Sequence, residues 1–303
     1  MMRTKKVLAA LAVPSVLVVT GASVAAAAPA EKPKAACPDK MIFEVGGHLD
    51  KDATAYDRTN AGLPAGVAFT KIHYSASIAP FPGDTVSMDD SVAEGIGNLD
   101  RAVRDFHAAC GGSHITISGY SQGAIVAGDE LNALSKTDDI PHNQINGVLY
   151  GDPRRPGVNG PGGIEGNIPT IIPGLSMKGP RGFGDLTVQE ICNKNDGICH
   201  SENPITNLLG FANGVAGYFL GDHGYDINPN AENGNGDRLI DQPPRVPHGA
   251  PLPVPIPTPW EMFNGNLPGA QGKVKEIRDK LLPLLPPDMR NRIAEFPWLS
   301  VPA

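Results

Sequence analysis

HITISGYSQGAIVA, residues 114–127, is the stretch that decides the fold. Alternating apolar residues in His114–Ser118 predict a short buried strand, and residues 122 to about 134 predict a helix. Between them, Ser121 lies in a Gly-x-Ser-x-Gly pattern. In that position the pattern is typical of a sharp turn that lifts the serine hydroxyl above a sheet. We therefore predict that Ser121 is a nucleophile, with a plain turn serine as the alternative.

Strands and helices alternate on both sides of this stretch. We expect strands at 41–45, 66–74 and 145–150, and helices at 91–109 and 208–220. Asp89 or Asp90 is expected to cap the first of these helices. Such alternation indicates a mostly parallel sheet with helices on both faces. We therefore predict the α/β class, and the serine turn favours an α/β-hydrolase.

The first thirty residues have the three parts of an export signal. A basic start is followed by an apolar run, Val7–Val19, and by alanines up to Ala30. Pro14 interrupts the run, which is shorter than the roughly twenty residues of a membrane-spanning helix. We expect a cleaved signal peptide at 1–30 and a secreted product that begins near Glu31. An uncleaved anchor or a lipoprotein is the alternative.

The charge of the exported chain disfavours nucleic acid as a partner. The signal holds three of the 25 basic residues and none of the 32 acidic ones, which leaves 22 against 32 and a net charge of −10. A surface of that sign repels a phosphate backbone. No later segment has eighteen consecutive apolar residues, so we expect a soluble protein.

All four cysteines follow the predicted signal peptide. They are Cys37, Cys110, Cys192 and Cys199. An even number of cysteines in an exported protein favours two disulfides. A zinc site is the alternative, but the sequence has no CxxC pair.

A serine nucleophile needs a histidine base, and in an α/β-hydrolase the base follows the serine in the chain. His223 follows a predicted helix and has glycines close on both sides, which suits a base on a mobile loop. His200 is the alternative. His142 lies in a polar turn and His248 in a proline-rich segment, so both are disfavoured.

A carboxylate must orient that histidine. Asp196 lies between Cys192 and Cys199, where a disulfide between the two cysteines would hold its carboxylate in place. Asp152 is the alternative, and its structural role would be to cap the turn after the strand at 145–150.

The composition changes after the predicted base. We expect a catalytic domain at 31–226 and, at 227–303, an Asn/Gly- and Pro-rich linker with an amphipathic helix at 273–282. Within the domain, the long loop 151–184 is either functional or a surface excursion. The acidic run at 226–237 lacks two residues that an EF-hand calcium loop requires, so a solvated turn is favoured.

Several motifs occur in order between residues 37 and 225. They resemble those of the cutinase-like serine esterases of actinobacteria, including the hydrolase domain attached to many mycobacterial PE and PPE proteins. The motifs are Cys37-Pro38-Asp39 with Gly46-Gly47, Ser91-Val92-Ala93-Glu94-Gly95, Gly119-Tyr120-Ser121-Gln122-Gly123-Ala124, Gly151-Asp152-Pro153, Cys192-x3-Asp196-x2-Cys199 and His223-Gly224-Tyr225.

The resemblance implies an α/β-hydrolase with a lidless or lightly covered site that hydrolyses esters of acyl chains, lipids or polyesters. It also implies disulfides that pair Cys37 with Cys110 and Cys192 with Cys199. It supports Asp196 as the acid and His223 as the base.

The sequence departs from the family at one position. After Gly46-Gly47 the family usually has Thr or Ser, whose backbone amide contributes to the oxyanion hole, and here the residue is His48. Backbone amides do not depend on the side chain, so we expect Gln122 and His48 to supply the two donors. The missing hydroxyl affects the expected rate and substrate range more than the reaction class.

Together these features predict an esterase in which Ser121 attacks, His223 transfers the proton and Asp196 orients the imidazole. We expect no cofactor and no metal, an ester or lipid as substrate, a monomer, and transient contact with a lipid or cell-envelope surface. The alternatives are an acyltransferase with the same triad and a non-catalytic binding protein on the same fold.

Overall fold

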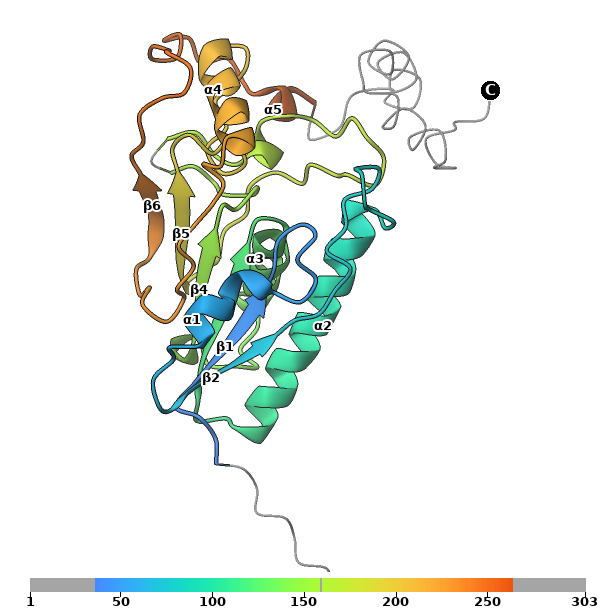
Figure 1. Ribbon diagram of the computed structural model, residues 1–303, viewed down its shortest axis with the longest axis vertical. Coiled ribbons are helices and arrows are strands. Elements are labelled where there is room, and N and C mark those ends of the chain that lie inside the picture. The colour runs from blue at the N-terminus through green and yellow to red at the C-terminus, as the bar shows by residue number, and fades with distance from the viewer. Residues whose placement is uncertain (1–35, 159, 264–303) are drawn as a thin grey trace, which may run out of the picture. The chain divides into compact units, whose positions relative to one another are not determined.

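A six-stranded, all-parallel sheet organises the part of the chain that the computed structural model describes, residues 36–158 and 160–263 (Figure 1). The strand order is β2-β1-β3-β4-β5-β6. This confirms the predicted α/β class. The strands are β1 (Lys40–Val45), β2 (Val67–Lys71), β3 (His114–Tyr120), β4 (Ile145–Tyr150), β5 (Thr187–Asn193) and β6 (Gly236–Ile240).

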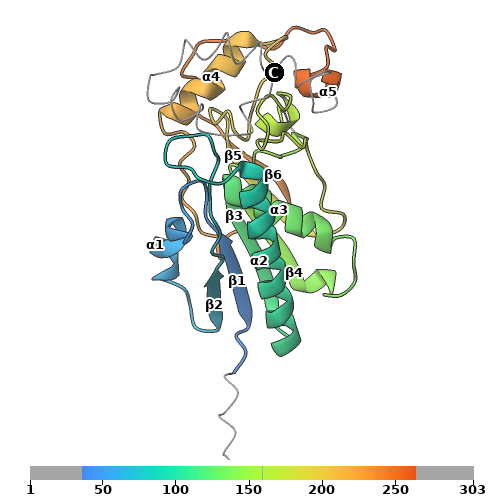
Figure 2. The same ribbon diagram turned by 90° about the vertical axis from the view of Figure 1, so that its right-hand side faces the viewer.

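Helices α2 (Met88–Ala109) and α3 (Gln122–Leu134) pack on one face of the sheet (Figure 2). Their apolar residues join the main core with side chains of the central strands, such as Ile117 and Leu149. Because successive side chains of a strand point to opposite faces, the neighbouring residues build a second, smaller core. That second core includes Val148 and Tyr150 of β4.

Shorter elements cover the second face. The 3-10 turn η1 (Thr54–Tyr56) buries Tyr56 in the smaller core, and helix α1 (Asp57–Asn60) follows directly. The Tyr56 hydroxyl lies 3.1 Å from the Ser118 hydroxyl of β3, which ties this turn to the strand that leads to Ser121.

Helix α2 begins earlier than predicted, and its predicted cap is wrong. Ser87, in extended backbone conformation, caps the helix by accepting a hydrogen bond from Asp90 N at 3.1 Å. The Ser87 hydroxyl donates in turn to the Asp90 carboxylate at 2.7 Å. Asp90, three positions after the cap, thus forms two hydrogen bonds with the Ser87 hydroxyl. The other predicted cap, Asp89, instead accepts hydrogen bonds from Ser176 in the long loop.

Strands β5 and β6 were not predicted, and β6 lies within the predicted linker. Both pair in register with their neighbours, from Asn146↔Thr187 for β5 and from Gln189↔Gly236 for β6. Each contains a buried charged residue, Glu190 in β5 and Asp237 in β6. These charged residues interrupt the alternation of apolar and polar residues by which a strand is predicted. Asp237 of β6 pairs with the fully buried Arg155 at 2.6 Å. The sheet therefore continues beyond the predicted boundary at residue 226.

The proline-rich segment after β6, predicted to be an extended linker, packs on the domain. Leu252 N donates to Thr206 O at 3.0 Å, and Asn203 Nδ2 donates to Ile256 O at 3.0 Å. The segment leads to helix α5 (Pro259–Phe263), where Trp260 Nε1 donates to Met177 O at 2.7 Å. The predicted signal peptide at 1–30 and the predicted helix at 273–282 lie outside the described residues.

Two disulfides have the pairing that the family resemblance implies. Cys37–Cys110 joins the start of the domain to the end of α2, with Cα atoms 5.6 Å apart. Cys192–Cys199 closes the loop after β5, with Cα atoms 5.9 Å apart. Among the described residues, no helix has both the length and the apolar character that crossing a bilayer requires.

A buried charge cluster lies between α3, β5 and the long loop. Arg181 donates to Ala124 O at 2.7 Å and lies 3.1 Å from Asp152 and 3.4 Å from Asp129. Glu190 of β5 is buried beside Asp152. The carboxylate of Asp152 is therefore engaged in holding the domain together.

Glu190 makes the stability of the domain depend on pH. Burial, and next the negative charge of Asp152, raises the pKa of Glu190 from 4.5 to about 9. A carboxyl group with a raised folded-state pKa stabilises the fold at low pH, and this contribution is lost as the pH rises toward the folded pKa. We expect Glu190→Gln, which has no proton to lose, to show a flatter dependence of unfolding free energy on pH between 5 and 9, measured by urea unfolding.

The matched control is Glu261→Gln, at an exposed position, which should keep the pH dependence of the wild type. If Glu190→Gln loses stability with pH as steeply as the wild type, the charge cluster does not hold a protonated Glu190.

Candidate active site

Ser121 lies at a strained turn between β3 and α3. Its backbone has φ 57° and ψ −121°, a conformation that few non-glycine residues adopt. The turn is held by Ser121 N, which donates to Tyr150 O at 2.9 Å. Any side chain at Gly119 would collide with the backbone of Gly123, and any side chain at Gly123 would collide with Val45 O. The predicted strand, turn and helix are present in that order. Only glycine fits at positions 119 and 123 of this turn.

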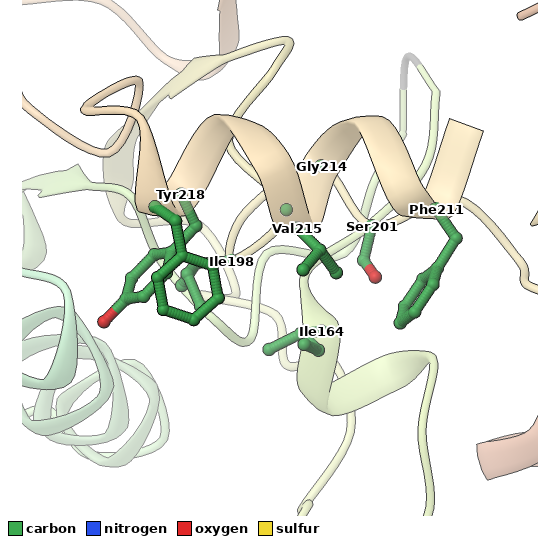
Figure 3. Close-up of a pocket in the computed structure, with 9 residues that line it drawn as sticks. Ile164, Ile198, Ser201, Phe211, Gly214, Val215 and Tyr218 are labelled. Atoms are coloured by element: carbon green, nitrogen blue, oxygen red, sulfur yellow. The ribbon is translucent and has the colours of Figure 1, made fainter. Parts of the chain in front are cut away.

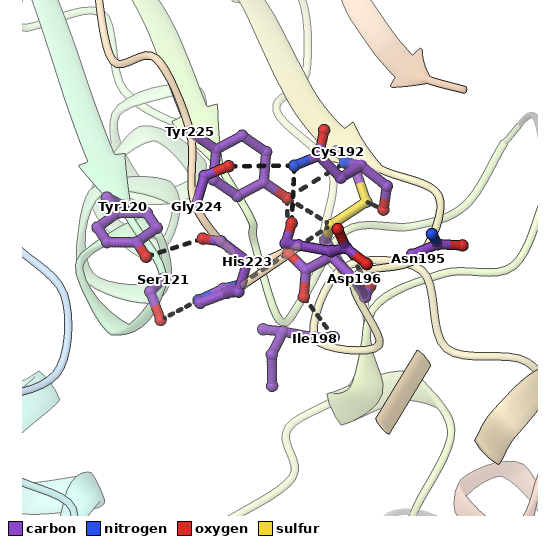
Figure 4. A network of polar contacts seen from close by, with 12 residues as sticks. Tyr120, Ser121, Cys192, Asn195, Asp196, Ile198, His223, Gly224 and Tyr225 are labelled. Atoms are coloured by element: carbon purple, nitrogen blue, oxygen red, sulfur yellow. Dashed lines mark hydrogen bonds and ion pairs between the residues drawn. A yellow bond between two sulfur atoms is a disulfide. The ribbon is translucent and has the colours of Figure 1, made fainter. Parts of the chain in front are cut away.

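The structure brings Ser121, His223 and Asp196 together in one chain of hydrogen bonds (Figure 4). Ser121 Oγ lies 2.8 Å from His223 Nε2, and His223 Nδ1 lies 2.6 Å from Asp196 Oδ2. Since an ionised carboxylate only accepts, Nδ1 donates to Asp196 and Nε2 is left to accept from the serine hydroxyl. This is the geometry of a serine activated by a histidine base.

Asp196 is fully buried in the loop that Cys192–Cys199 closes. Besides the imidazole, it accepts hydrogen bonds from the Tyr225 hydroxyl at 2.6 Å and from Ile198 N at 3.0 Å. Burying a carboxylate is costly unless its oxygens are satisfied. These donors and the disulfide keep Asp196 in one position beside His223.

The alternative residues lie elsewhere. Asp152 belongs to the buried charge cluster, and its Oδ1 accepts from Arg154 N at 3.0 Å, the turn-capping role considered for it. Burial lowers the pKa of His200 to about 4, so this imidazole is a poor base. In the described part of the chain, no hydrogen bond joins either residue to Ser121.

The loop at 46–48 lies against Ser121. A Cβ atom at Gly47 would be 3.1 Å from Ser121 Cβ. Within residues 36–158 and 160–263, neither His48 N nor Gln122 N donates a hydrogen bond to another residue. The His48 side chain is held by Asp84, whose buried carboxylate lies 2.8 Å from His48 Nε2. The two backbone donors proposed for an oxyanion hole thus remain available to a ligand.

The same described residues place no group of three His, Cys, Asp or Glu side chains in an arrangement that could hold a metal ion.

Comparison with known families matches residues 65–246, more than half of the chain, to the PE-PPE domain. The chain belongs to the PE-PPE domain family. The PE-PPE match contains Ser121, Asp196 and His223. It also contains β6.

Two proteins share parts of this chain's sequence. The chain is 37% identical over 145 residues to a carboxylesterase Culp6 homolog from Corynebacterium glutamicum, over 41% of this chain and 47% of that protein. It is 31% identical over 93 residues to the uncharacterized PPE family protein PPE28 from Mycobacterium tuberculosis, over 30% of this chain and 13% of that protein. The similarity thus spans less than half the length of either relative.

Solved structures with a similar fold include two esterase or cutinase-like proteins. The catalytic core domain of acetyl xylan esterase from Trichoderma reesei has a TM-score of 0.41 and 18% identity, over 61% of this chain and 96% of that chain. A cutinase-like protein from Cryptococcus sp. has a TM-score of 0.39 and 19% identity, over 63% of this chain and 97% of that chain.

Aromatic residues around the base of the PE-PPE domain were not predicted to be functional. The Tyr120 ring stacks on the His223 ring at 5.2 Å, and its hydroxyl donates to His223 O at 2.8 Å. The Tyr218 ring lies 5.2 Å from the same imidazole, and the Tyr225 ring lies at 6.0 Å. These rings fix the plane of the base. Sequence offers one signal for them, since Tyr120 and Tyr225 lie within motifs of the family.

We expect His48→Ala to lower kcat about tenfold with little change in KM, measured with a soluble short-chain ester. The variant removes the contact between the loop at 46–48 and Asp84, and this loop carries one proposed oxyanion donor. Because an oxyanion donor acts chiefly in the transition state, its loss lowers kcat more than it changes KM. The matched control is His73→Ala, because His73 also pairs with an aspartate, Asp52, at 2.8 Å, but with both side chains exposed. Equal kcat values for the two variants would show that the His48 side chain does not support the proposed oxyanion donors.

Proposed function

We propose that this PE-PPE domain protein is a secreted serine esterase that hydrolyses carboxylic esters. The observation that carries the proposal is the unbroken chain from Ser121 through His223 to Asp196, with separations of 2.8 and 2.6 Å. A serine hydroxyl is a weak nucleophile at neutral pH and needs such a base. The similarity to a carboxylesterase homolog is in line with this chemistry.

In the proposed reaction, Ser121 Oγ attacks the ester carbonyl while His223 Nε2 takes the hydroxyl proton. Asp196 holds the imidazole in the required tautomer and stabilises its positive charge. Backbone N–H groups of Gln122 and His48 stabilise the negative oxygen of the tetrahedral intermediate. The C–O bond to the alcohol breaks, and His223 gives its proton to the leaving alcohol. Water, activated by the same imidazole, then releases the acid and restores Ser121.

Exposed apolar side chains beside the triad support a substrate of low polarity. Leu49 follows the loop at 46–48 and is 64% exposed, and Phe219 and Leu220 precede His223 with exposures of 78% and 61%. Apolar groups that gather at one site of a surface favour contact with an apolar partner. We propose that they make transient contact with a lipid or cell-envelope surface.

Secretion is supported by the disulfides Cys37–Cys110 and Cys192–Cys199. Structural disulfides persist in oxidising compartments and are rare in reducing ones. The second disulfide closes the loop that holds Asp196, so the proposed function itself benefits from oxidation.

Hydrolysis of p-nitrophenyl butyrate tests the proposal. We expect Ser121→Ala and His223→Ala to lose at least about 10³-fold in kcat, because triad members act as a unit. Ser135→Ala, which changes a serine at the end of α3, should keep full activity. Product analysis with an added alcohol shows whether water or an alcohol releases the acyl group. Undiminished turnover by Ser121→Ala would refute the proposal.

A further inference from the structure

Residues 242–246, which follow β6, contact the loop 193–199 that carries the proposed acid, here called the acid loop. Asn195 of this loop immediately precedes Asp196. The backbone N of Asn195 donates to Gln242 Oε1 at 3.2 Å, and its Nδ2 donates to the carbonyl oxygen of residue 243 at 2.7 Å. Two hydrogen bonds thus join the segment to the residue next to the acid.

The same segment holds the loop 220–224 that carries the proposed base, here called the base loop. Asp222 immediately precedes His223. Arg245 Nε donates to Asp222 Oδ2, and Arg245 Nη2 donates to Asp222 Oδ1, both at 2.8 Å. Such a two-point pair of guanidinium and carboxylate fixes orientation as well as distance. The guanidinium also holds the pKa of Asp222 below its ordinary value of 3.8, so the pair is ionised at neutral pH.

Helix α4 (Leu208–Phe219) connects the acid loop to the base loop and is itself fixed to the segment. Asn213 Oδ1 of the helix accepts from Arg245 N at 2.6 Å. Tyr218 of the helix and Ile198 of the acid loop line a cavity under α4 (Figure 3). Because the bond to Asn213 comes from the backbone of Arg245, the segment keeps this attachment when the guanidinium is removed.

The backbone of the base loop has a separate support from the sheet. Asn193, the last residue of β5, donates from Nδ2 to Asp222 O at 2.7 Å and to Gly224 O at 3.2 Å, the carbonyl oxygens on either side of His223. These bonds do not neutralise the Asp222 carboxylate, whose side chain is only 9% exposed. A carboxylate buried to this extent is destabilising once its positive partner is lost. Without Arg245 it gains by turning toward water, which displaces the residue next to the base.

We propose that Arg245 is a positioning residue, which keeps His223 in line with Ser121 by holding the Asp222 carboxylate inside the domain. The inference rests on the proposed esterase function. Within the described part of the chain, no hydrogen bond joins Arg245 to Ser121 or to His223. Arg245 therefore acts through Asp222, and its loss affects the rate of reaction rather than the binding of the ester.

Substitution of Arg245 tests this role in the hydrolysis of p-nitrophenyl butyrate. We expect Arg245→Ala to lower kcat about tenfold with little change in KM, since a displacement of about 1 Å can cost about 10²-fold in rate. Arg245→Lys, which keeps the charge but loses the two-point contact, should fall between the wild type and Arg245→Ala. Arg238→Ala is the matched control and should keep the wild-type kcat. Arg238 also pairs with a carboxylate, that of Glu232 at 2.6 Å, and its side chain is 50% exposed against 42% for Arg245.

A second substitution separates the pairing of charges from a general loss of packing. In Asp222→Asn no carboxylate needs a partner, and removing both members of a buried pair is less destabilising than removing one. We expect Asp222→Asn combined with Arg245→Ala to regain a kcat within about threefold of the wild type. A double variant no more active than Arg245→Ala would contradict a role that acts through Asp222.

Proton NMR of the folded protein separates the positioning role from the reaction. The proton in the 2.6 Å hydrogen bond between His223 Nδ1 and Asp196 should give a resolved resonance at low field, absent from His223→Gln. We expect Arg245→Ala to broaden or lose this resonance and Arg238→Ala to keep it.

The outcomes of the two measurements are distinct. A resonance that depends on Arg245, with no hydrolysis by the wild type, would uphold the positioning role and refute the esterase. Hydrolysis by the wild type, with kcat and resonance unchanged in Arg245→Ala, would overturn the positioning role and leave the esterase standing. Neither a resonance nor hydrolysis in the folded wild type would overturn both.

Discussion

The backbone turn at Ser121 places the serine hydroxyl above the carboxyl end of the parallel sheet, and the surrounding structure depends on it. With φ at 57°, the turn brings α3 so close to β3 and β1 that a side chain at Gly119 or Gly123 would collide with backbone. Strain of this kind persists only where packing holds it. Here the apolar residues of β3 and α3 in the main core provide that packing. The position of the nucleophile is therefore a consequence of the core.

The acid and the base reach this fixed serine from two loops on the same side of the sheet. Cys192–Cys199 and the Tyr225 hydroxyl hold Asp196, and the rings of Tyr120 and Tyr218 hold His223. Helix α4 lies in the chain between Asp196 and His223, and its Tyr218 packs against the imidazole. The same helix also carries exposed apolar side chains, among them Leu209 and Phe219.

Much of this arrangement could be predicted from local patterns in the sequence. The strand into Ser121, the helix after it and the helix at 208–220 have clear periodicity, and the structure has them within a residue or two. Strands β5 and β6 could not be predicted, because each contains a buried charged residue, Glu190 in β5 and Asp237 in β6, and Asp237 pairs with Arg155, which lies far away in the chain. The positions of Ser121, Asp196 and His223 follow their predicted order, but the aromatic cage depends on side-chain packing that no motif encodes. The cavity under α4 likewise forms between segments that are distant in sequence.

The most direct test of the central claim is the reaction of the purified protein with diethyl p-nitrophenyl phosphate. The serine oxygen forms a bond to phosphorus, p-nitrophenolate leaves, and His223 accepts the serine proton. We expect one equivalent of p-nitrophenolate per chain, with the phosphoryl group located on Ser121 by peptide mass spectrometry. The reaction should slow by at least about 10³-fold in His223→Gln. A label on any other residue, or labelling of Ser121 at the same rate without His223, would contradict the account.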